Sequence, residues 1–133
     1  MSHTTNYQNT LITIAPDSAA AGGIIPPKPD SIAGRQYALL ITAPYTMTSD
    51  DLLFAVHADK NGLPDTDEAR AAFFAKPQAC LRASPLPKHY GWGIHHDVAS
   101  RIAMHAVGSG EYARLSKDTG IKMVAAMRTK RAG

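Results

Sequence analysis

The residues best suited to chemistry in this chain gather in one segment, residues 79–106. This segment contains the only cysteine, Cys80, the only tryptophan, Trp92, and four of the six histidines. Imidazole nitrogens bind protons, metals and anions near neutral pH, and a thiol becomes a nucleophile when a neighbouring base or cation lowers its pKa. A functional site is therefore expected within this segment.

Two predicted strands, residues 92–97 and 101–106, give the segment its geometry. Side chains alternate between the two faces of a strand, so a hairpin with Ile94 opposite Met104 buries one apolar face that includes Trp92. The opposite face is polar and carries Gly91, Gly93, His95, Arg101, Ala103 and His105. In this register His95 and His105 are diagonal neighbours, within side-chain reach of each other.

Cations from nearby elements complete the candidate ligand-binding site. A third predicted strand, residues 79–84, would add Arg82 to the polar face, and a basic loop at residues 85–90 would add Lys88. A guanidinium, two imidazoles and a glycine backbone open to close approach suit a carboxylate or a phosphate. The predicted site residues are Arg82, Lys88, Gly91, Gly93, His95 and His105. The simpler alternative is an ordinary polar sheet face, with glycines that make room for the indole.

Neither a metal nor a cofactor is predicted. His95 and His96 point to opposite faces of a strand, so they cannot bind one ion. A metal would need His95, His105 and a carboxylate such as Asp50, Asp51 or Asp97, which the sequence does not place beside them. The single cysteine excludes an internal disulfide and cysteine-rich zinc sites. Nucleophile-elbow, phosphate-loop and dinucleotide-binding motifs are absent, and no catalytic residue is assigned.

Three functions fit these observations. The first is a binding module for an anionic ligand, small or macromolecular, at the sheet face of residues 80–105. The second is a small enzyme in which His95 or His105 is the general acid–base and Arg82 stabilises developing negative charge. The third is an interaction protein that forms a homodimer through a sheet edge.

Length and composition predict one domain that spans residues 1–133. Hydrophobic residues make up 44% of the chain and charged residues 19%, which is typical of a globular protein. No apolar run is long enough to cross a membrane, and the polar N-terminus lacks the order of a signal peptide, so a cytoplasmic location is expected. A formal net charge of +3 is too small to favour nucleic acid as the partner.

The periodicity of the remaining segments predicts an α+β fold. We expect a mainly antiparallel sheet with two or three helices in two layers, the helices packed on one face. A Pro/Gly-rich loop is predicted at about residues 19–29, because two glycines and three prolines there exclude regular structure. The other predicted strands are residues 9–15 and 121–128, and the predicted helices are residues 31–42, 64–75 and 109–118.

One block, residues 48–62, allows two interpretations. Ser49 followed by two aspartates could cap a helix, with Asn61 and Gly62 at its end. Against this, Leu52, Phe54, Val56 and Ala58 alternate with their neighbours in the period of a strand. We favour a strand that ends in an Asn-Gly turn.

Five segments together resemble a known family: HTTNY at 3–7, TSDDLLFAVHA at 48–58, CLRASPL at 80–86, YGWGIH at 90–95 and AMRTKR at 126–131. They are similar to a family of short bacterial and fungal proteins known as a domain of unknown function. The resemblance covers nearly the whole chain, which implies one intact domain. It carries over no activity, ligand or catalytic residue.

Overall fold

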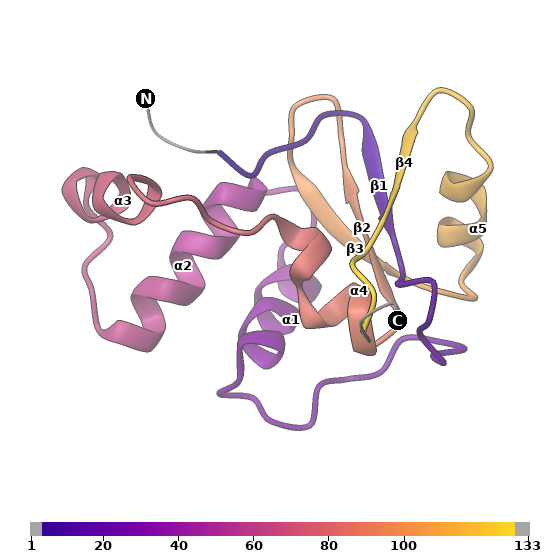
Figure 1. The fold of residues 1–133 in the computed structure, drawn as a ribbon, viewed down its shortest axis with the longest axis horizontal. Coiled ribbons are helices and arrows are strands. Elements are labelled where there is room, and N and C mark those ends of the chain that lie inside the picture. The colour runs from indigo at the N-terminus through magenta and orange to yellow at the C-terminus, as the bar shows by residue number, and fades with distance from the viewer. Residues whose placement is uncertain (1–3, 130–133) are drawn as a thin grey trace.

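The computed structural model describes residues 4–129, and its core is a four-stranded sheet (Figure 1). The strands are β1 (Thr10–Thr13), β2 (Trp92–His96), β3 (Ile102–Ala106) and β4 (Lys122–Ala125). The α-helices are α1 (Ile32–Thr42), α2 (Ser49–Asn61), α3 (Asp67–Phe74), α4 (Pro85–His89) and α5 (Gly110–Ser116), and a 3-10 helix, η1, spans Leu81–Ala83. The α+β class is confirmed, with more helices in this range than the predicted two or three.

The sheet order is β3-β2-β1-β4, and the pairing is mixed. The β2–β3 hairpin is antiparallel with Ile94 opposite Met104, so the predicted register is confirmed. β1 pairs antiparallel with β2 and parallel with β4. The parallel pair is possible because α5 and its connections carry the chain from one edge strand, β3, to the other, β4.

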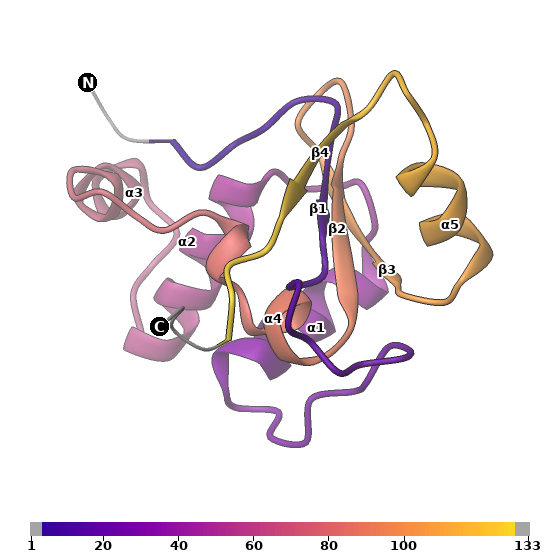
Figure 2. The ribbon, with the colours of Figure 1, turned by 45° about the vertical axis from the view of Figure 1, so that its right-hand side comes forward.

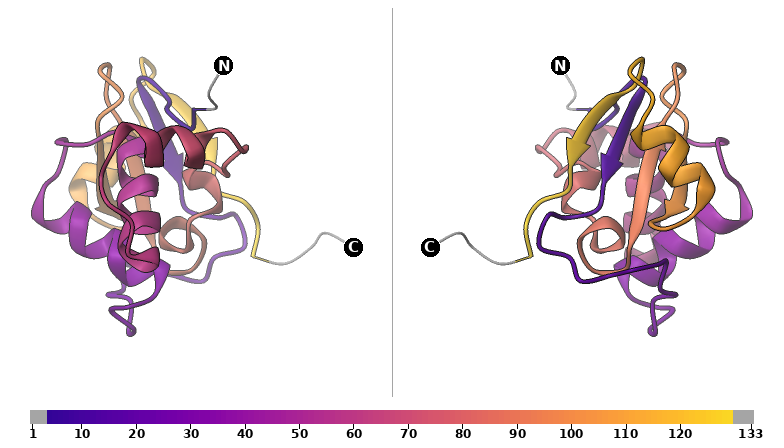
Figure 3. Two further views of the ribbon diagram at one scale, coloured as in Figure 1. Left: turned by 90° about the vertical axis from the view of Figure 1, so that its left-hand side faces the viewer. Right: turned by 90° about the vertical axis from the view of Figure 1, so that its right-hand side faces the viewer.

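Helices cover both faces of the sheet, whereas the sequence predicts helices on one face. The main core packs α1, α2 and α4 against Ile12, Ile94 and Ile102. α5 lies on the opposite face, where Tyr112 packs over Gly93. Figures 2 and 3 show α5 alone on its side of the strands, away from α1 and α4. The face that carries His95 and His105 is therefore partly covered by a short helix.

The strand prediction for residues 48–62 is wrong, because this block is the helix α2. Its alternating apolar residues belong to two helical faces that interleave. Leu52 and Val56, four residues apart, face the main core, while Phe54 and Ala58 face a second cluster with Phe74 of α3. Two faces offset by two residues give a period of two in the sequence, although each follows the helical spacing.

The beginning of α2 carries a helix-start signal one residue before Ser49. Thr48 caps the helix through a capping box with Asp51, and Gly62 ends it with a left-handed backbone. Both features stabilise helix termini and have no counterpart in a strand.

The predicted strand at residues 79–84 is also wrong. Residues 81–83 form η1, and Ser84 then caps α4, whose first residue is Pro85. A serine N-cap before a proline is typical of a helix start, because proline lacks the N–H that the first turn leaves unpaired. The basic loop predicted at residues 85–90 is accordingly mostly helical. Among residues 4–129, no helix has the length and apolarity to cross a membrane.

Candidate functional site

One tyrosine hydroxyl joins the two histidines of the polar sheet face. Tyr45 Oη lies 2.8 Å from Nδ1 of His95 and 2.9 Å from Nε2 of His105. The two histidines stand on adjacent strands, opposite Ala103 and Gly93 respectively, so the diagonal arrangement predicted for them is found. Each imidazole is held by one ring nitrogen, which fixes its orientation on a rigid sheet.

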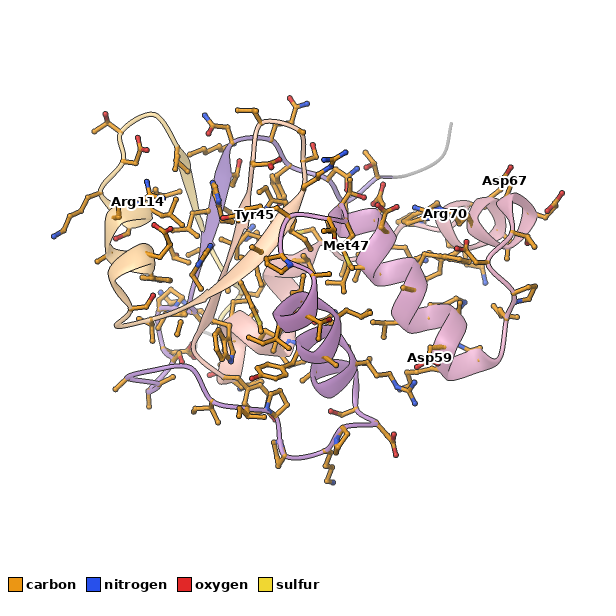
Figure 4. The ribbon with its side chains drawn as sticks, turned by 180° about the vertical axis from the view of Figure 1, so that it is seen from behind. Tyr45, Met47, Asp59, Asp67, Arg70 and Arg114 are labelled. Atoms are coloured by element: carbon orange, nitrogen blue, oxygen red, sulfur yellow. The ribbon has the colours of Figure 1, made fainter. Side chains whose placement is uncertain are left out.

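Tyr45 reaches this face because the loop before α2 pairs with the outer edge of β3. The Tyr45 N–H donates to the carbonyl of Ile102 at 2.8 Å, and the Ile102 N–H donates to the carbonyl of Met47 at 2.9 Å. Tyr45 has a φ of 58°, a left-handed conformation that costs energy for a bulky side chain. Figure 4 labels Tyr45 on this loop and Arg114 on α5.

Burial favours the neutral forms of His95, His105 and Tyr45. It lowers the pKa of His95, opposed by the charge of Asp97, and it lowers the pKa of His105, opposed by Glu111. Burial also raises the pKa of the Tyr45 hydroxyl, and the charges of Glu111 and Asp97 add to this effect. At neutral pH the cluster is therefore two neutral imidazoles and a phenol.

A cleft of about 320 Å³ opens beside His95, between the sheet and α5. We call it the α5 cleft, and its polar lining residues are Asn9, His95, Asp97, Arg114 and Asp118, with Val98, Leu115, Gly120 and Ile121 completing it. Arg114 forms an ion pair with Glu111 through Nε. Within residues 4–129, the terminal nitrogens of Arg114 have no hydrogen-bond partner, so they are available to a ligand.

The structure brings together only part of the predicted site. Gly93 lies on the histidine face, but a Cβ there would come within 2.6 Å of the Tyr112 ring. A Cβ on Gly91, whose φ is 75°, would come within 2.2 Å of the carbonyl oxygen of Gly22. Both glycines therefore allow close packing of the protein on itself, and neither leaves the backbone open to a ligand.

Arg82 and Lys88 lie away from His95. Arg82 donates from Nε to the carbonyl of Ala125 at 2.7 Å, and β4 is two strands from β2 in the sheet. Lys88 lines a separate cleft near Asp17 and Thr129. The physical reason for the position of Arg82 is that residues 79–84 do not join the β2–β3 edge as a strand.

His96 and Cys80 lie in surroundings that are typical of residues with a structural role. His96 lies on the apolar face as predicted, it is fully buried, and neither ring nitrogen has a hydrogen-bond partner among the described residues. Cys80 is partly buried, with its Sγ 3.3 Å from the Tyr7 hydroxyl. Between residues 4 and 129 no three histidine, cysteine, aspartate or glutamate side chains are grouped as a metal site requires.

The comparisons with known proteins identify the family. A family model for a family of unknown function, DUF6157, matches residues 2–132. The chain belongs to DUF6157. Neither the comparison with curated proteins nor the comparison with solved structures found a match.

In this DUF6157 member, two residues of the candidate site, Tyr45 and Arg114, are not predicted from the sequence. Tyr45 enters through edge pairing of a loop, and strand periodicity carries no information about such pairing. Arg114 directly precedes the buried Leu115 on α5, so it lies at the border of the helix face that packs on the sheet. The sequence does predict this helix, and the helical spacing from Tyr112 and Leu115 places Arg114 beside the sheet.

Proposed function

We propose that this protein is a binding module for a small molecule with a carboxylate or phosphate group, and that the α5 cleft is its binding site. The observation that carries the proposal is the position of His95. Tyr45 occupies its Nδ1, so Nε2 is the ring nitrogen left for a ligand, beside the unoccupied terminal nitrogens of Arg114. A guanidinium with two parallel donors and an imidazole N–H are a suitable pair for a carboxylate.

The hydrogen-bond chain supports an N–H at this position. If Tyr45 donates its hydroxyl proton to His95 Nδ1, neutral His95 carries its proton on Nε2 and can donate to an anion. Tyr45 then accepts a hydrogen bond from Nε2 of His105. His105 thus acts on the ligand through Tyr45 and His95, as a positioning residue.

Binding accounts for the geometry better than the two alternatives. The enzyme alternative pairs Arg82 with a histidine, whereas Arg82 bonds to the backbone of β4. The homodimer alternative needs an open sheet edge. Residues 45–48 pair with Arg101 and Ile102 at the start of β3, and Arg82 bonds to Ala125 at the end of β4 and to Met127 just after it, so both edges are partly covered.

The proposal is tested by titrating the protein with propionate and with inorganic phosphate. Amide chemical shifts, recorded at pH 7 and constant ionic strength, report the binding. We expect saturable shifts at His95 and in α5 for at least one of these anions. Arg114→Gln should weaken this binding by about tenfold or more, because hydrogen bonds to charged groups are worth about 1.5–3 kcal/mol. Arg128→Gln, an exposed arginine away from the cleft, is the matched control. Shifts that never saturate, or equal losses in both variants, would show that the α5 cleft is not an anion site.

A further inference from the structure

The α5 cleft carries charges of both signs. Arg114 supplies a guanidinium, but Glu111 already pairs with it. Two further carboxylates, Asp97 and Asp118, line the same cleft. The described lining of the cleft therefore combines one guanidinium with two carboxylates, and a ligand with only negative charge would leave both carboxylates without a partner.

The two aspartates are held in place by backbone groups and not by cations. Asp97 Oδ1 accepts the N–H groups of Ala99 and Arg101, each at 2.9 Å. Asp118 Oδ1 accepts the N–H of Gly120 at 2.8 Å. Throughout residues 4–129, neither carboxylate has an ion pair, and neither Oδ2 has a hydrogen-bond partner. Backbone N–H groups thus orient both carboxylates, and each keeps one oxygen without a hydrogen-bond partner in this range.

Hydrogen bonds of Asn9 connect the two turns that carry these aspartates. The Asn9 N–H donates to the carbonyl of Asp97 at 3.0 Å, and the Asn9 side chain donates to the carbonyl of Gly120 at 2.6 Å. Asn9 has a φ of 50°, which asparagine tolerates better than most residues. One residue thereby ties the turn after β2 to the turn before β4.

We infer that the ligand of the α5 cleft is a small zwitterion, a free α-amino acid. This inference rests on the proposed function and narrows it. The carboxylate of the amino acid binds the terminal nitrogens of Arg114 and Nε2 of His95, and its ammonium group binds between Asp97 and Asp118. Such a ligand satisfies both signs of charge at once, whereas a simple carboxylate leaves the aspartates unpaired.

The size of the cleft agrees with a small ligand. Its volume of about 320 Å³ lies at the lower end of the range for small-molecule sites, roughly 300–1,000 Å³. Its apolar lining is limited to Val98, Leu115 and Ile121, which suits a short side chain.

Three ligands that differ in one group each test the inference. L-alanine carries both charged groups, propionate lacks the ammonium, and ethylamine lacks the carboxylate. Amide chemical shifts at pH 7 and constant ionic strength report their affinities for the full-length protein. We expect L-alanine to bind at least tenfold more tightly than propionate or ethylamine, with shifts at His95, Asp97 and α5.

Matched variants then separate the two ends of the ligand. Asp118→Asn keeps an oxygen for the Gly120 N–H, so the turn can form, and it should reduce the preference for L-alanine over propionate to about twofold. Arg114→Gln should weaken L-alanine and propionate alike. Asp65→Asn, an exposed carboxylate elsewhere, should change neither affinity.

The relative affinities of the three ligands decide between the zwitterion inference and the anion-binding proposal. If propionate binds as tightly as L-alanine, the zwitterion inference is wrong and the anion-binding proposal stands. If ethylamine binds as tightly as L-alanine, the cleft is a cation site and both are wrong. If no probe binds, both are wrong as well.

Discussion

Tyr45 shows how one residue converts two polar side chains on a sheet into an oriented pair. Its hydroxyl has one proton to donate, so it donates to one histidine and accepts from the other. The direction of this chain fixes the tautomers of both rings together. In one direction His95 and His105 both carry the proton on Nε2, and in the reverse direction both carry it on Nδ1.

The proposed anion site requires the first direction, which gives a prediction at the residue scale. We expect nitrogen-15 NMR of the imidazoles at pH 7 to show both His95 and His105 as Nε2–H tautomers. Tyr45→Phe removes the link and should let each ring populate both tautomers, because neither Nδ1 of His95 nor Nε2 of His105 then has its partner. Tyr90→Phe is a control that leaves the cluster intact. A pair of Nδ1–H tautomers in the wild type would contradict the assignment.

His96 makes a separate prediction about pH. Burial lowers its pKa to about 4, and nearby backbone groups of Ile94 and Thr10 offset only part of this effect. The unfolded chain therefore binds a proton that the folded protein excludes between about pH 6.5 and pH 4. The stability that depends on neutral His96 is complete above pH 6.5 and is lost as the pH falls through 4. The loss is on the order of 3 kcal/mol.

His96→Leu removes this titration together with two unpaired buried nitrogens. We expect the free energy of unfolding to rise by about 1 kcal/mol at pH 7, because a buried polar group without a partner is costly. The decrease between pH 7 and pH 4 should shrink, and a smaller part from His95 and His105 should remain. Urea denaturation at both pH values measures this, with the exposed His89→Gln as control. Destabilisation at pH 7 would show that the His96 ring has a favourable interaction.

At the scale of elements, the sequence predicts what depends on local chemistry. Acids in the first turn of α3 and the alternation of β2 and β3 were sufficient to identify these elements. The predicted secondary structure is wrong where two local patterns overlap, as in α2. It is also wrong where a short helix begins with a serine cap and a proline, as in α4. Of the predicted site residues, His95, His105 and Gly93 share one sheet face, whereas Arg82 lies elsewhere because residues 81–83 form a 3-10 helix and not a strand.

Gly34 illustrates a tertiary constraint inside a helix. Glycine in the middle of a helix such as α1 is usually unfavourable by about 1 kcal/mol relative to alanine. Here a Cβ would lie 2.3 Å from the carbonyl oxygen of Lys28 and 2.7 Å from that of Pro29. The loop before α1 crosses directly over the helix at this glycine. The low helix propensity of glycine is therefore accepted because only a residue without a Cβ lets the loop pack so closely.

The prediction for this element is that Gly34→Ala destabilises the protein, by about 1–3 kcal/mol, because the methyl group must displace backbone. Gly110→Ala at the start of α5 is the matched control. A Cβ there meets nothing within 4 Å, so we expect no change or a gain of a few tenths of a kcal/mol. Thermal or urea unfolding compares the two. Equal stabilisation by both substitutions would show that the loop moves away from α1 at no cost.

Over the whole molecule, the segments that carry the family resemblance contact one another. Thr5 donates two hydrogen bonds to Asp50 at the start of α2, and Tyr7 contacts Cys80. The backbone carbonyl of Arg82 accepts a hydrogen bond from the Met127 N–H. These contacts hold the N-terminal segment, η1 and β4 together, away from the α5 cleft. The resemblance therefore reports mainly on the fold, and among the described residues of its segments only His95, in YGWGIH, belongs to the candidate site.

The molecule is also uneven in its packing, since α3 belongs to a small second cluster. Phe74 packs there with Phe54 and Ala58 of α2, and a half-buried ion pair joins Arg70 to Asp51. Clefts of about 410 Å³ lie on two sides of this contact. Figure 4 shows Asp67 and Arg70 of α3 at the far end of the molecule from Arg114.

This asymmetry predicts that α3 opens without the rest of the protein. In native-state hydrogen exchange at increasing urea, we expect amides of α3 to exchange with a lower free energy and a smaller urea dependence than amides of β2. Phe74→Ala removes the main anchor, so α3 should lose protection while β2 and β3 keep their chemical shifts. Leu86→Ala, a truncation in the main core, should instead reduce protection in the sheet itself, by about 2–5 kcal/mol. If the amides of α3 and β2 follow one common urea dependence, the second cluster unfolds together with the sheet and α3 is an integral part of the core.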